Sequence, residues 1–276
     1  MKTSFLPILF TLWICLTLDT GATPAEEVIR FPSGPLTLGG VLYKPEGKGP
    51  FPAVLYNHGS APKMLNKQVS DILGPLFAGR GWIFFMPYRR GQGLSENAGP
   101  YIMDQVEAEE KKNGEAAAKS LLVKLLKTEQ LDDQMAALAW LKKQKFVQNE
   151  KIAVAGNSFG GIETVLGAAV EPFCAAVNAA GAAQTWKSMT EIQAMMKESV
   201  RKSTCPMFFF QAENDYDLDP SKILSAEMKA AGKNSELKIY PAFGKSQKEG
   251  HSFAYLGSKV WAEDVFSFLN KSCHRP

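Results

Sequence analysis

The sequence predicts an α/β fold in which a mostly parallel central sheet has helices on both faces and an antiparallel hairpin at its N-terminal end. Short continuous apolar runs, each followed by a glycine or polar loop, are typical of strands buried on both faces. Amphipathic segments separate these runs, and strands that alternate with helices build a mostly parallel sheet. The runs lie at residues 51–60, 82–93, 151–161, 174–182, 205–215 and 237–244.

The remaining elements follow from turn residues and from the spacing of apolar side chains. Residues 26–34 and 35–45 are two β-rich stretches separated by Gly and Pro, which indicates a hairpin. Residues 131–144 carry leucines and a methionine three and four positions apart, and residues 221–233 contain Gly232 where a helix stop is expected. Both segments are therefore predicted to be helices.

Two further stretches are predicted to be helical insertions. Residues 96–130 are polar and rich in alanine, and residues 182–204 contain Trp186 and several methionines. We expect helix on the surface or over the mouth of a pocket. The shape of that pocket would depend on these two segments.

The N-terminal end has the features of a secretory signal peptide. Lys2 precedes an apolar run at residues 5–18, which is too short for a bilayer core that needs about 20 residues. Small residues up to Ala22 suit cleavage after that residue, so residues 1–22 are predicted to be removed on export. A buried N-terminal helix is the alternative. The mature protein is expected to be secreted or periplasmic, with no integral membrane segment.

Composition limits the size and the partners of the mature chain. Of 276 residues, 45% are hydrophobic, and no internal repeat or linker interrupts the sequence, so residues 23–276 are predicted to form a single domain. Lys and Arg number 31 against 28 for Asp and Glu. The resulting net charge of +3 is too weak to indicate a nucleic-acid partner.

Cysteines and histidines offer no metal site by their spacing, and neither a metal nor an organic cofactor is expected. In an oxidising compartment Cys174, Cys205 and Cys273 could hold one disulfide. Cys174 and Cys205 each open an apolar run, so small buried thiols are favoured over a bridge.

A candidate nucleophile follows the strand predicted at residues 151–155. Gly156-Asn157-Ser158-Phe159-Gly160 matches the pattern G-x-S-x-G and leads into a helix-compatible segment. In such a tight strand-to-helix turn the neighbours of the serine must lack side chains, which accounts for the two glycines. The turn exposes the hydroxyl of Ser158 at a helix N-terminus, where negative charge is stabilised. An ordinary capping serine is the alternative.

A serine nucleophile needs a base, and the sequence contains only three histidines. His274 lies near the chain end, and His58 precedes the nucleophile and ends another strand. By elimination His251 is the candidate base. It is predicted to lie in a glycine-containing loop that follows the strand near residue 240.

The acid that orients the base should follow a strand between Ser158 and His251. Asp215 lies nearest the end of the run 205–215 and is preferred. Asp217 is the rival, and Glu213 is a weaker candidate. Charge on the substrate oxygen needs backbone donors: the N–H of Phe159 is the first, and the N–H of Ser60, beside Gly59, is the second.

The order of these motifs resembles that of the α/β-hydrolases. The hairpin, the segment Tyr56-Asn57-His58-Gly59-Ser60, the segment 89–95, the serine turn, Asp215 and Gly250-His251 carry this resemblance over roughly residues 27–270. Within the superfamily the chain is similar to the dienelactone hydrolase group and to related esterases and prolyl-oligopeptidase-like domains. Dienelactone hydrolases proper carry a cysteine nucleophile, whereas this chain has Ser158, so lactone specificity is not transferred. The resemblance implies that Arg89 and Arg90 are structural.

These observations predict a secreted serine hydrolase that cleaves small carboxylic esters through an acyl-enzyme. The predicted triad is Ser158, Asp215 and His251. A prolyl-oligopeptidase-like peptidase would use the same residues but usually depends on an additional propeller domain. A binding protein that keeps the fold without turnover is the other alternative.

Overall fold

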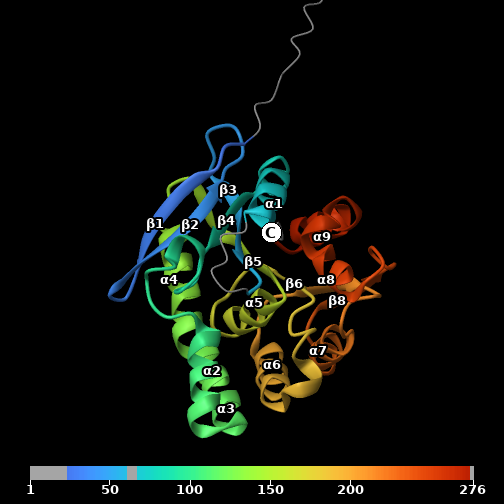
Figure 1. Ribbon diagram of the computed structural model, residues 1–276. Coiled ribbons are helices and arrows are strands. Elements are labelled where there is room, and N and C mark those ends of the chain that lie inside the picture. Colours follow the sequence, from blue (N-terminus) through green and yellow to red (C-terminus); the bar gives the residue numbers. More distant parts are fainter. Residues whose placement is uncertain (1–23, 61–66, 274–276) are drawn as a thin grey trace, which may run out of the picture.

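The computed structural model describes residues 24–60 and 67–273, and Figure 1 shows their arrangement. The predicted signal peptide at residues 1–22 and His274 lie outside the described residues. In the described part of the chain, no helix is long and apolar enough to cross a membrane.

The described residues form an eight-stranded sheet with the strand order β1-β2-β4-β3-β5-β6-β7-β8. Strand β1 pairs antiparallel with β2, and β2 pairs antiparallel with β4, whereas all later pairs are parallel. The predicted hairpin and the mostly parallel sheet are both confirmed. The strands are β1 (Glu27–Ser33), β2 (Leu36–Tyr43), β3 (Phe51–Asn57), β4 (Ile83–Pro87), β5 (Val147–Asn157), β6 (Ala176–Ala179), β7 (Met207–Ala212) and β8 (Ser235–Tyr240).

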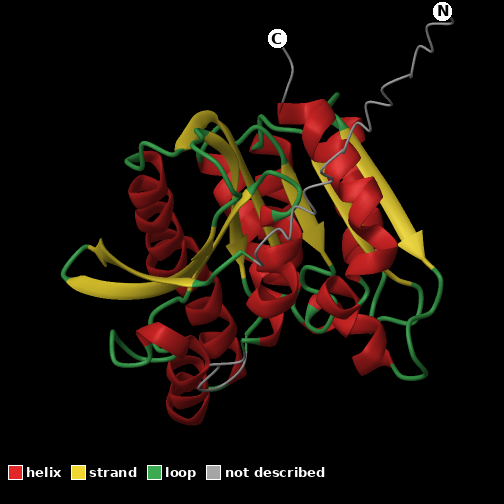
Figure 2. Ribbon diagram, turned by 90° about the horizontal axis from the view of Figure 1, so that it is seen from above, coloured by secondary structure: helices red, strands yellow, loops and turns green. Residues whose placement is uncertain are grey.

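Helices cover both faces of this sheet, as Figure 2 shows. The α-helices are α1 (Gln68–Ala78), α2 (Ile102–Asn113), α3 (Glu115–Leu125), α4 (Leu131–Lys142), α5 (Phe159–Val170), α6 (Thr190–Lys202), α7 (Asp219–Ala230), α8 (Gln247–Leu256) and α9 (Ser258–Cys273). Shorter helical turns are η1 (Gly93–Ser95), η2 (Leu126–Gln130) and η3 (Trp186–Ser188). Helices α2 to α7 pack into one core cluster, and α1, α8 and α9 pack into the other.

The two core clusters explain the continuous apolar runs of the sequence. Along β5, Ile152 and Val154 point into one cluster, and Ala153 and Ala155 point into the other. Successive side chains of a strand face opposite sides of the sheet, so a strand covered on both sides needs apolar residues at every position.

Both predicted insertions are helical and lie on the same side of the sheet. Residues 96–130 form α2, α3 and η2, and residues 182–204 form η3 and α6. Figure 1 shows α3 beside α6, and the two helices are in contact.

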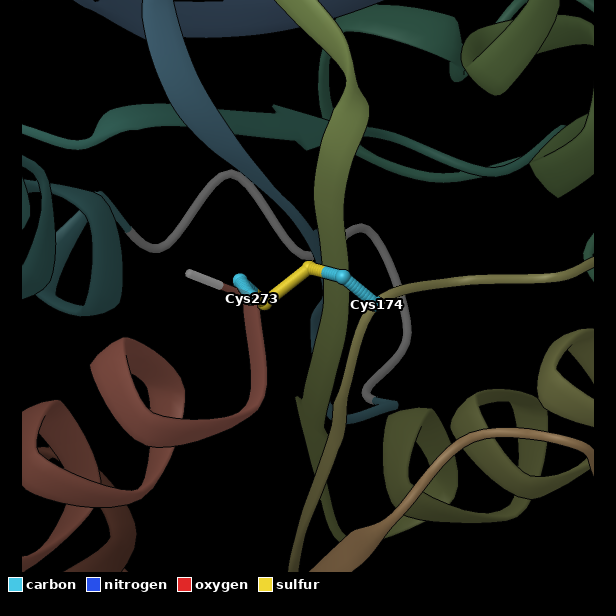
Figure 3. Close-up of a disulfide and its surroundings, with 2 residues drawn as sticks. All are labelled: Cys174 and Cys273. Carbon is cyan, nitrogen blue, oxygen red and sulfur yellow. A yellow bond between two sulfur atoms is a disulfide. The ribbon is translucent and has the colours of Figure 1, made fainter. Parts of the chain in front are cut away.

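The preference for free thiols is wrong for two of the cysteines. Cys174, just before β6, is bonded to Cys273 at the end of α9 (Figure 3), and only Cys205 among the described cysteines is a free, buried thiol. The apolar run that opens at Cys174 reports burial correctly. The run does not indicate that α9 packs nearby, so it could not predict the bond to Cys273, which lies 99 residues further along the chain.

Candidate active site

The turn between β5 and α5 places Ser158 in a conformation that most side chains avoid. Ser158 has φ 55° and ψ −120°, between the last residue of β5 and the first residue of α5. A non-glycine residue at positive φ is costly and persists only where its surroundings hold it. The N–H of Ser158 donates to the carbonyl oxygen of Ala179 on β6, which fixes this turn to the sheet.

Steric crowding accounts for both glycines of the turn. A Cβ at Gly160 would lie 2.0 Å from the carbonyl oxygen of Asn57, at the end of β3. A Cβ at Gly156 would lie 2.4 Å from the carbonyl oxygen of Gly160. Real Cβ atoms do not approach backbone oxygens so closely, so both positions must lack a side chain. The sequence interpretation of these glycines therefore agrees with the packing.

His251 lies in helix α8, so the prediction that it lies in a loop is wrong. Ser246 and Glu249 form a capping box that begins α8: the Ser246 hydroxyl accepts from the N–H of Glu249, and the Glu249 carboxylate accepts from the N–H of Ser246. The capping-box pair Ser246/Glu249 is visible in the sequence and could have located this helix. Gly250, by contrast, is unfavourable inside a helix and favours the loop prediction.

Close packing against Asn214 explains why a glycine stands inside this helix. A Cβ at Gly250 would lie 2.6 Å from the side-chain oxygen of Asn214. Asn214 also donates to the carbonyl oxygens of Phe243 and Ser246 and accepts from the N–H of Phe243. Asn214 therefore holds the start of α8 against the loop that carries Asp215. Sequence reasoning missed this residue.

The structure brings Ser158, His251 and Asp215 together at the carboxyl edge of the sheet. Nε2 of His251 lies 2.8 Å from Oγ of Ser158, and Nδ1 of His251 lies 2.8 Å from Oδ1 of Asp215. The side chain of Asp215 is fully buried, and that of His251 is 14% exposed. Oδ1 of Asp215 also accepts from the N–H of Tyr216 at 2.6 Å. These contacts hold the imidazole in a single orientation between the carboxylate and the hydroxyl.

The two rival carboxylates have other surroundings. Asp217 Oδ1 accepts from the N–H of Asp219 in the first turn of α7, and its Oδ2 lies 3.9 Å from Nζ of Lys187. Glu213 is exposed. Of the carboxylates left open by the sequence, Asp215 is the one in contact with the imidazole.

The loop after β3 brings Gly59 and Ser60 beside the serine. A Cβ at Gly59 would lie 3.6 Å from Cβ of Ser158, and the hydroxyl of Ser60 is hydrogen-bonded to that of Tyr101. Phe159 is the first residue of α5, where a backbone N–H has no acceptor within the helix. Of the two predicted oxyanion donors, Phe159 directly follows Ser158 in the chain, and Ser60 lines the same cavity as Ser158.

A buried arginine ties this loop to the helix that follows the serine. The guanidinium of Arg89 donates to the carbonyl oxygens of His58 and Gly59 and to Oε2 of Glu163 in α5. Its carbon lies 4.9 Å from the centre of the Phe159 ring. Arg90 pairs instead with Asp133 of α4. Both arginines occupy supporting positions, as the resemblance implied.

Burial shifts the pKa values of His58 and Glu163, the two titratable side chains in contact with Arg89. Burial and the neighbouring Arg89 guanidinium hold the pKa of His58 well below its usual value, so this imidazole stays neutral. Burial raises the pKa of Glu163 to about 7, and the charge of Arg89 opposes the rise. Glu163 is the one charged residue of α5, whose other residues are apolar apart from Thr164. That pattern could have identified it as a paired, buried charge.

Ser158 and His251 open into a cavity of about 320 Å³. One wall is formed by α8 and another by the loop after β3. The lining residues are Gly59, Ser60, Val69, Asn157, Ser158, Gln184, Tyr216, Lys248, His251, Ser252 and Tyr255. Within the described ranges, no cluster of three His, Cys, Asp or Glu side chains is suited to holding a metal ion.

Solved structures with the same architecture identify the fold as that of the α/β-hydrolases. An acylaminoacyl peptidase of Pyrococcus horikoshii is similar with a TM-score of 0.66 and 18% identity, over 96% of this chain and 45% of that protein. An esterase of Pyrococcus furiosus is similar with a TM-score of 0.65 and 13% identity, over 99% of both chains. A candidate dienelactone hydrolase of Klebsiella pneumoniae has a TM-score of 0.63 and 17% identity, over 91% of this chain and 99% of the other. This chain spans less than half the length of the acylaminoacyl peptidases that it matches.

The sequence assigns the chain to one family among the proteins with this fold. The profile of the dienelactone hydrolase family matches residues 38–272, and the chain belongs to that family. A search among curated proteins finds no match.

The neutral state of His58 predicts a pH-dependent part of the stability. The unfolded chain binds a proton on this histidine below pH 6.5, whereas the folded protein does not, so the free energy of unfolding falls as pH drops below 6.5. The contribution amounts to about 1.4 kcal/mol per pH unit until the folded imidazole itself titrates. The free energy of unfolding is measured by denaturant unfolding at several pH values between 7 and 5. Its slope against pH should lack this contribution in His58→Gln.

Comparison of the two slopes isolates the contribution of His58, because every other titratable group is present in both proteins. Identical slopes in wild type and His58→Gln would show that the buried imidazole is protonated in the folded state as well.

Proposed function

We propose that this protein is a serine hydrolase that cleaves small carboxylic esters through a covalent acyl-enzyme. The observation that carries the proposal is the pair of 2.8 Å contacts that join the imidazole of His251 to Oγ of Ser158 and to Oδ1 of Asp215. A serine hydroxyl is a weak nucleophile until a base within hydrogen-bond distance takes its proton. These contacts supply that base and the group that orients it.

The reaction follows from the atoms in contact. His251 Nε2 accepts the proton as Ser158 Oγ attacks the ester carbonyl, and the imidazolium that forms is stabilised by the buried carboxylate of Asp215. The same imidazolium then donates its proton to the departing alcohol oxygen. Water then enters, and His251 takes one of its protons as the water oxygen attacks the acyl carbonyl carbon. The imidazolium returns this proton to Ser158 Oγ as the bond between Oγ and the acyl carbon breaks, and the acid is released.

Stabilisation of the negatively charged intermediate is assigned to the N-terminus of α5. The N–H of Phe159 lies in the first turn of α5, where the helix dipole favours negative charge. The N–H of Ser60 is the proposed second donor. Removal of one such donor typically lowers the rate about 100- to 1,000-fold.

A peptidase or amidase activity is the second candidate. The similar solved structures include an acylaminoacyl peptidase and an esterase, and their low identity to this chain supports the fold alone. Esters are preferred because they are more reactive and need no further subsites. Lactone specificity is not assigned, since Ser158 stands in the predicted nucleophile position.

Export of the protein is proposed on two grounds. Lys2 and the apolar run at residues 5–18 have the pattern of a signal peptide. The bond between Cys174 and Cys273 is of a kind that persists in oxidising compartments such as the periplasm or the extracellular medium.

Purified protein should hydrolyse p-nitrophenyl acetate with a higher kcat/KM than aminoacyl p-nitroanilides. Ser158→Ala should lose the esterase activity to within background while its unfolding transition stays about the same, because the substitution removes a single oxygen at a partly buried position. Faster cleavage of the anilides would instead favour the peptidase candidate. Wild-type protein inactive on both substrates would favour a binding protein.

The two aspartates of the loop after β7 form a matched pair for a second test. Asp215→Asn should lower kcat by about 10⁴-fold, because an amide cannot stabilise the imidazolium or fix its tautomer. Asp217→Asn should retain kcat within a few-fold, since its carboxylate contacts the first turn of α7. Equal losses in both variants would contradict the assignment of Asp215.

A further inference from the structure

A second cavity lies between the two helical insertions, residues 96–130 and 182–204, and the start of α5. Its volume is about 290 Å³, and its walls come from α2, α3, α5, η3 and α6. The lining is mostly apolar and includes Val106, Ala118, Leu122, Ile162 and Ile192. Charged side chains are confined to Glu110, Glu115 and Lys119, of which Lys119 and Glu115 form an ion pair.

This cavity and the one that holds the serine are lined by neighbouring residues of the chain. Ser158 lines the first cavity and Phe159 the second, and likewise Gln184 lines the first and Thr185 the second. The linings of the two cavities therefore meet at two places along the chain. The partly buried ring of Phe159 stands at one of these places.

The position of His251 decides which half of an ester would face the second cavity. The imidazolium donates its proton to the alcohol oxygen, so the alcohol half must lie on the side of His251. Lys248, Ser252 and Tyr255 of α8 line the first cavity on that side. The second cavity has no lining residue from α8 and adjoins Phe159, the predicted oxyanion donor, so it lies on the side of the acyl half.

We propose that the second cavity binds the uncharged acyl chain of the ester, which reaches it past the ring of Phe159. This inference rests on the proposed function and adds the substrate class to it. A charged chain would lose its hydration among apolar side chains without compensation. The volume equals that of about ten water molecules, which suits chains of medium length better than long fatty acids.

The chain-length profile of hydrolysis tests the proposal. For p-nitrophenyl esters from acetate upwards, kcat/KM should rise about fourfold per added methylene until the cavity is full, and then fall. In a second series, the acetyl group is kept and the alcohol is lengthened. That series should show no comparable rise.

A matched pair of variants on α3 links the profile to this cavity. Ala118 is buried and lines the cavity, whereas Ala116 is exposed on the same helix. Ala118→Phe should fill the cavity and lower kcat/KM for the octanoate ester about tenfold or more while acetate hydrolysis is kept. Ala116→Phe should leave the whole profile unchanged.

A variant that enlarges the second cavity keeps the test decisive if Ala118→Phe does not fold. Ile192→Ala removes a buried side chain from the cavity wall and should shift the preferred acyl chain to a longer one. Such a gain cannot arise from loss of folded protein.

Three outcomes would overturn the proposal. They are a flat acyl profile, an unchanged profile in both Ala118→Phe and Ile192→Ala, or a response of the alcohol series instead of the acyl series. In each of these cases the esters are still cleaved, so the proposed function stands. Absence of hydrolysis across both series would overturn the proposed function and this inference together.

Discussion

The close approach of two backbone segments at the serine turn is the constraint on which the rest of the site depends. The carbonyl oxygen of Asn57 at the end of β3 lies where a side chain at Gly160 would have to be, and Gly156 packs against the same turn. Only with glycines at both positions can α5 begin so close to β3. This contact accompanies the positive φ of Ser158, and Gly59 lies beside the same serine.

Buried polar interactions keep the two segments in this relation. Arg89 bonds both to the carbonyl oxygens of the loop after β3 and to Glu163 in α5. Loss of one partner of a buried ion pair typically costs about 3–5 kcal/mol, because the other charge stays buried without compensation. On the opposite side of the site, Asn214 performs a comparable role for α8 and His251. Ser158 and His251 are therefore each supported from a neighbouring loop.

Much of the fold and of the candidate site could be predicted from local pattern. Continuous apolar runs located the strands, and the glycine spacing located Ser158. With only three histidines in the sequence, elimination led to His251. The choice between Asp215 and Asp217 depends on which carboxylate meets an imidazole 30 or more residues away in the chain. Sequence spacing alone therefore cannot choose between the two aspartates. The 2.8 Å distance between Nδ1 of His251 and Oδ1 of Asp215 shows that Asp215 is the carboxylate beside the imidazole.

Other features depend on packing between distant segments and left little local trace. The pairing of Cys174 with Cys273 requires the end of α9 to dock beside β6. The support by Asn214 requires α8 to approach the loop after β7. The apolar cavity arises only where α2 and α3 face α6, although each segment alone was predicted to be helical. The helix that carries His251 has a local signal in the capping box of Ser246 and Glu249, whereas Gly250, which is unfavourable inside a helix, indicates a loop.

Trapping of the covalent intermediate tests the central claim most directly. The protein is mixed rapidly with p-nitrophenyl acetate, quenched in acid and mapped by peptide mass spectrometry. The account predicts a burst of about one nitrophenolate per chain and a single acetyl group on the peptide that contains Ser158. Continued ester hydrolysis with no acetyl group on Ser158, or with the acetyl group on another side chain, would contradict it.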